Sequence, residues 1–438
     1  MKNEQSASCS SVLHSRSSQA KGGRRSKAID NSGEGMDVRR ERQLTPGGES
    51  HEPAVAPSVI DGGAIEFRAL RGPEGFESLR DSWQDLVAKF DGATYVQSAQ
   101  WHAAHLANLE AHPDDVRYFA AYRGASLAAV FPLRLDIRRL AGMTYRRLTT
   151  LTHPHATLAD AVLARSPDGV AILRAFLSWL ARQRSVAWDE IAFEGIAADS
   201  ALGHALAGAA PARFEREVQG ASCFLDTRGS LDEALAQVSG SFKRNLRRLA
   251  RRAQESAPLR FRVESQPEAM SAALDRFLQL EASGWKGESG TGSAIALDAN
   301  LRGFYCALAD AFAATGAWRI HLLDLGDETV AAQLCLVAGA RLSILKIAFL
   351  EARSEFAPGN LLMERTIDVC CADPSIRSMS FVTNPPWAHL WKPQQQAVLR
   401  IRGFRPGVRG WILFVALRLK HGFAALLRHA RRQVADPS

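Results

Sequence analysis

The sequence lacks the features that define zinc-binding, disulfide-stabilised and membrane-spanning proteins. Its 438 residues include six cysteines, none in a CxxC pair and none in a cysteine–histidine cluster with zinc spacing. We therefore expect reduced thiols and a cytoplasmic protein. No apolar run approaches the ~20 residues that a membrane-spanning helix requires. The longest, residues 411–417, is far shorter.

Signals for secretion and for nucleophilic catalysis are missing as well. Residues 1–18 are polar and contain no apolar segment of the kind found in signal peptides, so we expect no secretory signal. No GxSxG sequence and no nucleophilic Cys–His signature occurs. His153 and His155 would share one face of a strand, but no further ligands can be assigned to them, so we expect no metal.

The composition is that of a folded protein with a modest positive charge. Hydrophobic residues make up 46% and charged residues 23%, which excludes wholesale disorder. Lys and Arg number 54 against 46 Asp and Glu, giving a formal charge of +8. This excess favours an acidic partner: phosphate groups, nucleic acid, an anionic membrane or an acidic polymer. It does not choose among them.

Patterning along the chain predicts four segments. Residues 1–60 are polar and nearly free of aromatics, which predicts a disordered tail. A strand, a tight turn and a second strand occur twice, at 117–135 and 319–337, so we expect a duplicated αβ unit. We place the two units at 61–225 and 226–408 and a basic amphipathic helix at 409–438.

Periodicity predicts the elements within these units. Apolar residues recur at helical spacing in six segments: 76–90, 98–110, 168–183, 267–282, 298–315 and 359–372. Strands are expected at 188–195 and 378–383, and an antiparallel meander is expected across 318–350, with turns at Gly326–Asp327 and Gly339. This alternation predicts an α+β fold.

Two basic helices carry a separate signal. Residues 241–255 place six Lys or Arg opposite an apolar stripe. This face, which includes Arg247 and Arg251, either contacts an anionic ligand such as tRNA, a nucleotide-linked precursor or anionic lipid, or is a solvated surface. The C-terminal helix mixes bulky apolar and basic residues, which suits either a peripheral contact with an anionic inner membrane or packing on the body.

Four stretches carry a resemblance to a known family. They are FKRNLRRLARR (242–252), FLQLEASGWKG (277–287), the meander 321–349 and PGNLL (358–362). Together they resemble the cellulose-biosynthesis (CelD/BcsL-type) acetyltransferases of the GNAT superfamily, which are related to FemAB-type aminoacyltransferases. The resemblance covers about residues 65–400. It implies two tandem GNAT-like units, each with a mainly antiparallel mixed sheet flanked by helices.

The resemblance also implies an activity. We expect transfer of an acetyl or other acyl group from acetyl-CoA or another acyl-CoA to an amine or a sugar hydroxyl. The acceptor would be a small-molecule or saccharide precursor of cellulose, exopolysaccharide or envelope. One alternative is an aminoacyl-tRNA-dependent, FemAB-like transferase. Another is a non-catalytic scaffold in a polysaccharide-synthesis assembly.

Candidate donor-binding residues lie around one helix start. Backbone N–H groups at a helix N-terminus can hold a pyrophosphate, and Pro358, Gly359, Asn360 and Leu361 follow the strand 341–349 at such a start. The alternative is a plain strand-to-helix turn. Gln333, inside an apolar strand, would either bond the donor's pantetheine arm or satisfy the sheet.

Candidate catalytic residues are Glu281 and Lys346. Lys346 interrupts an apolar strand and is costly to bury unpaired, so it either faces a substrate or joins a structural ion pair with Glu281. We assign Glu281 as the base and Lys346 as the group that aligns an anionic ligand. Trp285 and Lys286 are candidate substrate contacts. They precede a glycine-rich loop, 287–292, that is either a mobile lid or an ordinary surface loop.

The segment NPPWAHLW, residues 384–391, completes the candidates. Asn384 stands where relatives commonly have an acid, and His389 is an alternative base because its ordinary pKa is near 6.5. Trp387 and Trp391 are candidate substrate contacts.

Overall fold

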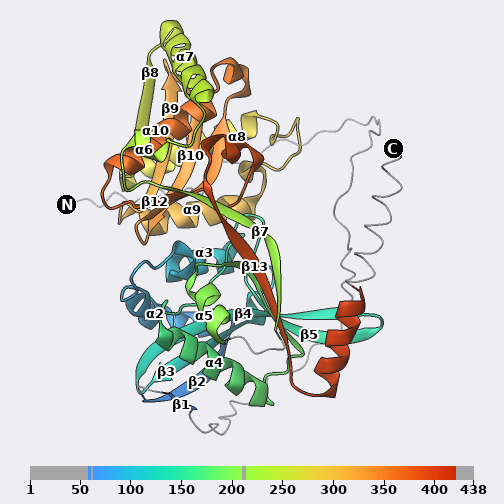
Figure 1. Cartoon of the computed structure of the whole chain (residues 1–438). Helices are drawn as coiled ribbons and strands as arrows, with labels where there is room; N and C mark the ends of the chain where they lie inside the picture. Colours follow the sequence, from blue (N-terminus) through green and yellow to red (C-terminus); the bar gives the residue numbers. More distant parts are fainter. Residues whose placement is uncertain (1–57, 61–62, 210–213, 421–438) are drawn as a thin grey trace, which may run out of the picture. The chain divides into compact units, whose positions relative to one another are not determined.

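The computed structural model describes residues 58–60, 63–209 and 214–420 (Figure 1). Most of the tail predicted over 1–60 lies outside these ranges. So do residues 421–438 of the predicted C-terminal helix. Within the described ranges no helix is long and apolar enough to cross a bilayer.

Among the described residues, thirteen strands join in one sheet, in the order β1-β2-β3-β4-β5-β6-β13-β7-β12-β11-β10-β9-β8. Neighbouring strands are antiparallel except β5–β6 and β11–β12, which are parallel. Helices flank the sheet, so the expected mixed α/β fold is confirmed. The strands are β1 (Ser58–Ile60), β2 (Gly63–Arg71), β3 (Val116–Arg123), β4 (Ser126–Leu140), β5 (Met143–Thr150), β6 (Glu190–Ala197), β7 (Glu215–Asp226), β8 (Leu259–Glu264), β9 (Trp318–Leu325), β10 (Glu328–Ala338), β11 (Arg341–Phe349), β12 (Ser378–Ser380) and β13 (Gln394–Phe404).

One order of strands and helices occurs twice along the chain, and each occurrence is called a path. A first strand is followed by two main helices, a three-stranded meander, a crossover helix and a parallel strand. This gives β2 through β6 and then β8 through β12. The helices of the first path are α1 (Gly72–Glu77), α2 (Arg80–Val87), α3 (Ala99–Asn108) and α4 (Pro167–Arg182). Those of the second path are α8 (Pro267–Ser283), α9 (Ala299–Ala313) and α10 (Pro358–Ala372). Within the residues that the structure describes, three further helices lie between the two paths: α5 (Ala201–Ala209) follows β6, and α6 (Leu231–Ala234) and α7 (Gly240–Ser256) precede β8.

The strand that follows each path pairs with a strand of the other path. β7 follows the first path but pairs with β12 of the second. β13 follows the second path but pairs with β6 of the first path. β7 and β13 also pair with each other (Figure 1). Where the boundaries of the two predicted units fall remains a prediction.

The second path packs a core on each face of its sheet. Along β10, Leu334 and Leu336 face the α8–α9 layer, whereas Ala331 and Cys335 face the layer that contains α10. This alternation is the period of a strand buried on both sides. Any polar residue on β10 must therefore find a partner inside the core.

Two predicted elements differ from the structure. The helix expected over 76–90 is broken into α1 and α2, because Ser78 Oγ donates to the Gly75 carbonyl and competes with the helical pattern there. The strand expected over 378–383 ends at Ser380, since Val382 adopts a left-handed conformation with φ of +63°. This early end opens the sheet beside the candidate site.

Candidate functional site

The sheet opens between β11 and β12. These two strands pair in parallel over Arg341–Ser343 and Ser378–Ser380. Among the described residues, β11 and β12 do not pair with each other beyond Ser343 and Ser380. Lys346 lies on β11 just past the last paired residue. The first path has the same opening between β5 and β6, beyond the pair Thr149–Ala192.

Lys346 is a half-buried lysine at this opening. Within the described part of the chain, no hydrogen bond or ion pair engages its ammonium group. Burial and the nearby Lys286 charge lower the pKa of Lys346 to about 8, and Glu281 opposes both effects. A substantial fraction of Lys346 is therefore neutral near pH 8 and able to accept a proton.

Glu281 pairs with Lys286 rather than with Lys346. Its side chain is buried, and one carboxylate oxygen accepts from Lys286 Nζ at 2.8 Å. The other accepts from the Ile295 backbone N–H at 2.9 Å. Both carboxylate oxygens of Glu281 therefore already accept a hydrogen bond. Its assignment as the base remains a prediction, and the ion pair expected with Lys346 is formed with Lys286.

Two histidines from the first path lie beside Lys346. His155 Nδ1 lies 3.1 Å from the Tyr305 hydroxyl, and the His155 backbone N–H donates to His153 Nδ1 at 3.1 Å. Burial and the Lys346 charge lower the pKa of both rings, that of His155 to about 3. Both rings are therefore neutral at pH 7, and His153 carries its proton on Nε2.

Sequence reasoning considered this pair only as metal ligands and missed Tyr305 altogether. Within the described residues, no group of three or more His, Cys, Asp or Glu side chains is arranged to hold a metal ion. The available signal was two polar rings, at His153 and His155, on one face of a short segment. Their partner Tyr305 lies 150 residues from His155, which no local pattern can reveal.

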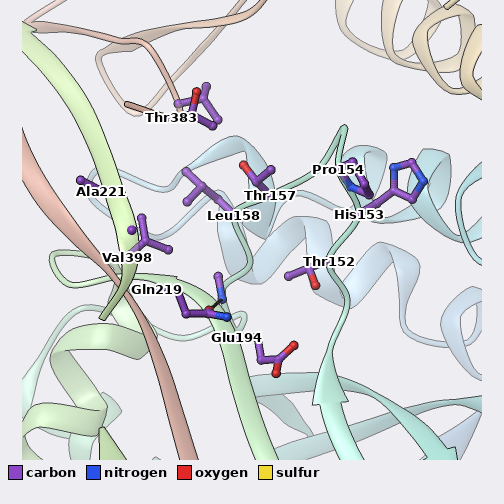
Figure 2. A pocket seen from close by; sticks show the side chains of 13 residues that line it. Thr152, His153, Pro154, Thr157, Leu158, Glu194, Gln219, Ala221, Thr383 and Val398 are labelled. Carbon is purple, nitrogen blue, oxygen red and sulfur yellow. Dashed lines mark hydrogen bonds between the residues drawn. The ribbon is translucent and has the colours of Figure 1, made fainter. Parts of the chain in front are cut away.

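A pocket of about 380 Å³ adjoins these residues (Figure 2). His153 lines this pocket, and the charge of Lys346 lowers the pKa of the same ring. The pocket therefore lies next to Lys346. Its polar lining comes from the loop after β5, the end of β6, β7 and the loop after β12. The polar side chains, besides His153, are Thr152, Thr157, Glu194, Gln219 and Thr383.

A glycine sets the shape of this pocket. Gly195, at the end of β6, has φ of +70°, and a Cβ there would lie 2.4 Å from the Thr157 carbonyl oxygen. The loop after β5 can therefore approach β6 closely only because residue 195 is glycine. The Gly195 N–H donates to Gln219 Oε1 at 3.1 Å, which fixes that amide in the wall. Figure 2 shows Thr383 at the opposite end of the pocket from Glu194.

The predicted helix start at Pro358 is confirmed. Pro358 is the first residue of α10, after an N-cap residue, Ala357, in the left-handed conformation. The N–H groups of Asn360 and Leu361 bond to the Ala357 carbonyl at 2.9 and 3.2 Å. A Cβ on Gly359 would make only ordinary contacts, so packing does not require glycine there. Phosphate binding at this helix start remains a prediction.

The basic helix lies close to the same region. α7 contacts both α10 and η4 (Glu351–Phe356), the segment just before Pro358. Arg247 and Arg251 are exposed, and Arg247 lowers the pKa of Glu364 on α10, which burial raises overall. Arg251 lies 3.6 Å from Glu255, an exposed pair that adds little stability. The basic face thus belongs to the surroundings of the α10 N-terminus.

Gln333 has its partners inside the core. It is 1% exposed, its Oε1 accepts from the Thr366 hydroxyl at 2.8 Å, and His321 Nδ1 lies 2.9 Å from that hydroxyl. Its amide oxygen is therefore already bonded. This favours the second alternative that the sequence left open, in which Gln333 satisfies the sheet.

The segment 384–391 is divided between core and surface. Trp391 is 1% exposed and meets Phe242 edge-on at 5.3 Å, and Trp387 meets Phe381 at 5.6 Å. Asn384 Oδ1 accepts from Cys223 Sγ at 2.7 Å. His389 is exposed. The structure therefore gives Trp391 a packing role and leaves the assignments of Asn384, Trp387 and His389 as predictions.

Trp285 and Lys286 take different positions. Trp285 is 58% exposed, and its N–H donates to Glu351 Oε1 at 3.1 Å. The loop that follows is folded on itself, since Gly292 N–H bonds to the Gly287 carbonyl at 3.1 Å and Ala294 N–H to the Lys286 carbonyl at 2.9 Å. Lys286 is thereby held between Glu281 and Lys346.

Comparisons with known proteins agree with this architecture. Residues 240–388 match the family model described as acetyltransferase (GNAT) domain. That segment contains α7, the meander, the α10 helix start and Lys346. The match spans α7 and the whole of the second path. No curated protein matches the chain significantly.

Solved structures match the chain at low sequence identity. FemX is 12% identical, with a TM-score of 0.50 over 74% of this chain and 96% of its own. L-PGS from Bacillus licheniformis is 14% identical, with a TM-score of 0.45 over 79% of this chain and 97% of its own. A tandem GNAT protein from the clavulanic acid biosynthesis pathway is 13% identical, with a TM-score of 0.37 over 77% of this chain and 98% of its own. At this identity the likeness to FemX shows the fold alone.

Proposed function

We propose that this chain is a GNAT-type acyltransferase that moves an acyl group from acyl-CoA to an amine or a sugar hydroxyl. One observation carries the proposal. Lys346, a half-buried lysine with a pKa of about 8, lies at the opening between β11 and β12, within the segment that matches the GNAT domain. A lysine so placed is suited to proton transfer near neutral pH.

The donor's phosphates bind at the N-terminus of α10. The Gly359 backbone N–H and the helix dipole favour negative charge there. The α7 cations, among them Arg247, add a positive field next to this helix. Acetyl-CoA carries phosphate groups, so this arrangement suits it as the donor. No metal takes part in this account.

The acceptor binds in the pocket lined by His153, Glu194, Gln219 and Thr383. Hydroxyl, amide and carboxylate groups suit an acceptor rich in hydroxyl groups, such as a saccharide precursor of cellulose, exopolysaccharide or envelope. Glu194 forms ion pairs with two arginines in this wall: Arg147 Nη1 lies 3.2 Å and Arg400 Nε 2.9 Å from its Oε1. The acceptor class rests on this polarity and on the family resemblance.

Transfer proceeds by direct attack. The acceptor nitrogen or oxygen adds to the thioester carbonyl while its proton passes to the neutral Lys346 amine. The tetrahedral intermediate then collapses, the carbon–sulfur bond breaks, and the leaving thiolate takes a proton from the Lys346 ammonium. His153 Nε2–H donates a hydrogen bond to the acceptor and orients it. Glu281 holds Lys286 in place and so helps to set the pKa of Lys346.

A thiol-release assay tests the proposal. Wild-type protein is given acetyl-CoA and a panel of amines, amino sugars and saccharides, and the free thiol is followed. We expect at least one acceptor to accelerate thiol release and Lys346→Met to lower that rate by about 100-fold. Lys89→Met, at an exposed lysine of the first path, is the matched control and leaves the rate unchanged. Equal rates for wild type and Lys346→Met would contradict the assignment.

A second candidate donor is aminoacyl-tRNA, favoured by the six Lys and Arg residues of α7. Replacing both Arg247 and Arg251 by Glu separates the two donors. With acyl-CoA as donor, the variant keeps its kcat, and only the KM for acyl-CoA rises because the positive field near α10 is weaker. With tRNA as donor, the variant loses tRNA binding and the steep salt dependence of that binding. A scaffold would instead tolerate Lys346→Ala and Glu281→Ala in a cellular assay.

A further inference from the structure

A helix over residues 408–420 carries large apolar side chains on two opposite faces. Its inner face buries Leu413 and Leu417 in a small cluster with Tyr145 of β5. Its outer face exposes four large side chains: Val408 by 76%, Trp411 by 66%, Ile412 by 46% and Leu419 by 69%. Ten large hydrophobic side chains are exposed within the described residues, and four of them lie in this one helix.

Those four side chains share one stripe. Positions 408, 411, 412 and 419, with the half-buried Val415, follow the spacing of a single helical face. An isolated exposed leucine needs no explanation, but a contiguous apolar stripe marks an interaction surface. Exposure to water costs this stripe free energy that a suitable partner would recover.

Two arginines fix the direction in which the stripe faces. Arg409 Nε donates to Asp189 Oδ1 at 2.7 Å, and Arg418 Nε donates to Glu215 Oε1 at 2.6 Å. These bonds clamp both ends of the helix beside β5 (Figure 1). With the inner face packed and the ends clamped, the outer face is held away from the sheet. The stripe is therefore preorganised for contact.

The charge of this part of the sequence selects the partner. Residues 400–435 contain nine Lys or Arg and no Asp or Glu, whereas the whole chain has 54 basic and 46 acidic residues. A basic segment with an apolar stripe matches a surface that is negative outside and apolar beneath, which is the structure of an anionic bilayer. Tryptophan is enriched at the interface of such bilayers.

We propose that the outer face of helix 408–420 docks on an anionic lipid bilayer, with Trp411, Ile412 and Leu419 entering the headgroup region. The helix lies in the plane of the interface and does not cross it. The positive charge of this part of the sequence adds electrostatic attraction to the lipid phosphates. This inference does not depend on the proposed acyl transfer.

Vesicle co-sedimentation of the full chain tests the proposal. We expect binding to phosphatidylcholine vesicles that contain a quarter phosphatidylglycerol, at least tenfold weaker binding to pure phosphatidylcholine, and further weakening as salt rises. The double variant Trp411→Glu/Ile412→Glu should lose at least tenfold in affinity. Leu297→Glu, at an exposed leucine outside this helix, is the matched control and should bind as wild type does.

A second measurement excludes misfolding as the cause. Brominated lipids in the vesicles should quench the fluorescence of the wild type more than that of Trp411→Phe, a variant that keeps the apolar stripe. Equal quenching of the two proteins, equal binding of the double variant, or equal binding to neutral and anionic vesicles would each overturn the proposal.

Discussion

Lys286 Nζ lies 2.8 Å from a carboxylate oxygen of Glu281, and this ion pair fixes a second cation beside Lys346. Lys286 lowers the pKa of Lys346 and Glu281 raises it. Glu281 therefore acts on the reaction through Lys346, by its own charge and by holding Lys286, rather than by contact with the acceptor. The two residues influence the same titration in opposite directions.

Opposite shifts of the pH–rate profile are therefore expected from changes at these two positions. Lys286→Met removes a repelling cation, so the rise of kcat/KM with pH should move above pH 8. Glu281→Gln removes an attracting carboxylate, so the rise should move below pH 8. The measurement is kcat/KM between pH 6 and 10. Shifts in the same direction, or none, would show that Lys346 is not the titrating group.

Lys346 should also cost stability. Its folded pKa of about 8 lies below the usual 10.5, so the folded state disfavours the charged form. Wild-type stability should then rise with pH between about 8 and 10.5. Lys346→Met should raise the free energy of unfolding at pH 7 by on the order of 1 to 3 kcal/mol, with a smaller gain at pH 10. Urea unfolding at both values measures this, and a destabilised variant at pH 7 would refute it.

Local patterns predicted much of the second path. The turn residues Gly326–Asp327 and Gly339 predicted the meander of β9, β10 and β11. Pro358 predicted the start of α10. Lys346 was chosen because a charged residue in an apolar strand is costly without a partner. Glu281 was chosen as its partner or as a base, and the family resemblance placed both residues near the site. The exchange of β7 and β13 was not predictable, since alternation along a strand specifies its faces and not its neighbour. His155 and Tyr305 meet only through that tertiary arrangement.

Two tryptophans that the sequence grouped as substrate contacts should behave differently. Trp391 is buried against Phe242, so Trp391→Ala should lower the free energy of unfolding by about 3 to 5 kcal/mol. Trp285 is 58% exposed, so Trp285→Ala should change it by less than about 1 kcal/mol. Denaturant unfolding compares the variants. Similar losses would mean that the packing around Trp391 is not as described.

Trp391→Phe refines this comparison. The Trp391 indole N–H is buried and has no hydrogen-bond partner among the described residues. Phenylalanine keeps the aromatic contact and removes that donor. We expect Trp391→Phe to cost well under half of the Trp391→Ala loss.

Acid should destabilise the fold below pH 6.5. Burial lowers the pKa of His102, His155 and His321 to about 3 and that of His105 to about 4. The unfolded chain binds protons at these residues near pH 5 while the folded chain does not, so stability falls as pH falls. Asp160, whose pKa burial raises to about 7, opposes this with one proton.

The slope of this decline is measurable. Near pH 5 the unfolded chain binds roughly three more protons than the folded chain does. This difference lowers the free energy of unfolding by at most about 4 kcal/mol for each pH unit that the pH falls. Urea unfolding at pH 7, 6 and 5 gives the slope directly. A free energy of unfolding that stays constant over this range would show that these histidines are protonated in the folded protein.

Calorimetric titration with acetyl-CoA tests the central claim most directly. The account predicts micromolar binding to the wild type, with desulfo-CoA also binding because its phosphates reach the α10 N-terminus. It predicts at least tenfold weaker binding after Gly359→Asp, which places a negative charge at that helix start, and unchanged binding after Lys89→Met. No heat up to millimolar acetyl-CoA would contradict an acyl-CoA donor and leave aminoacyl-tRNA as the donor to test.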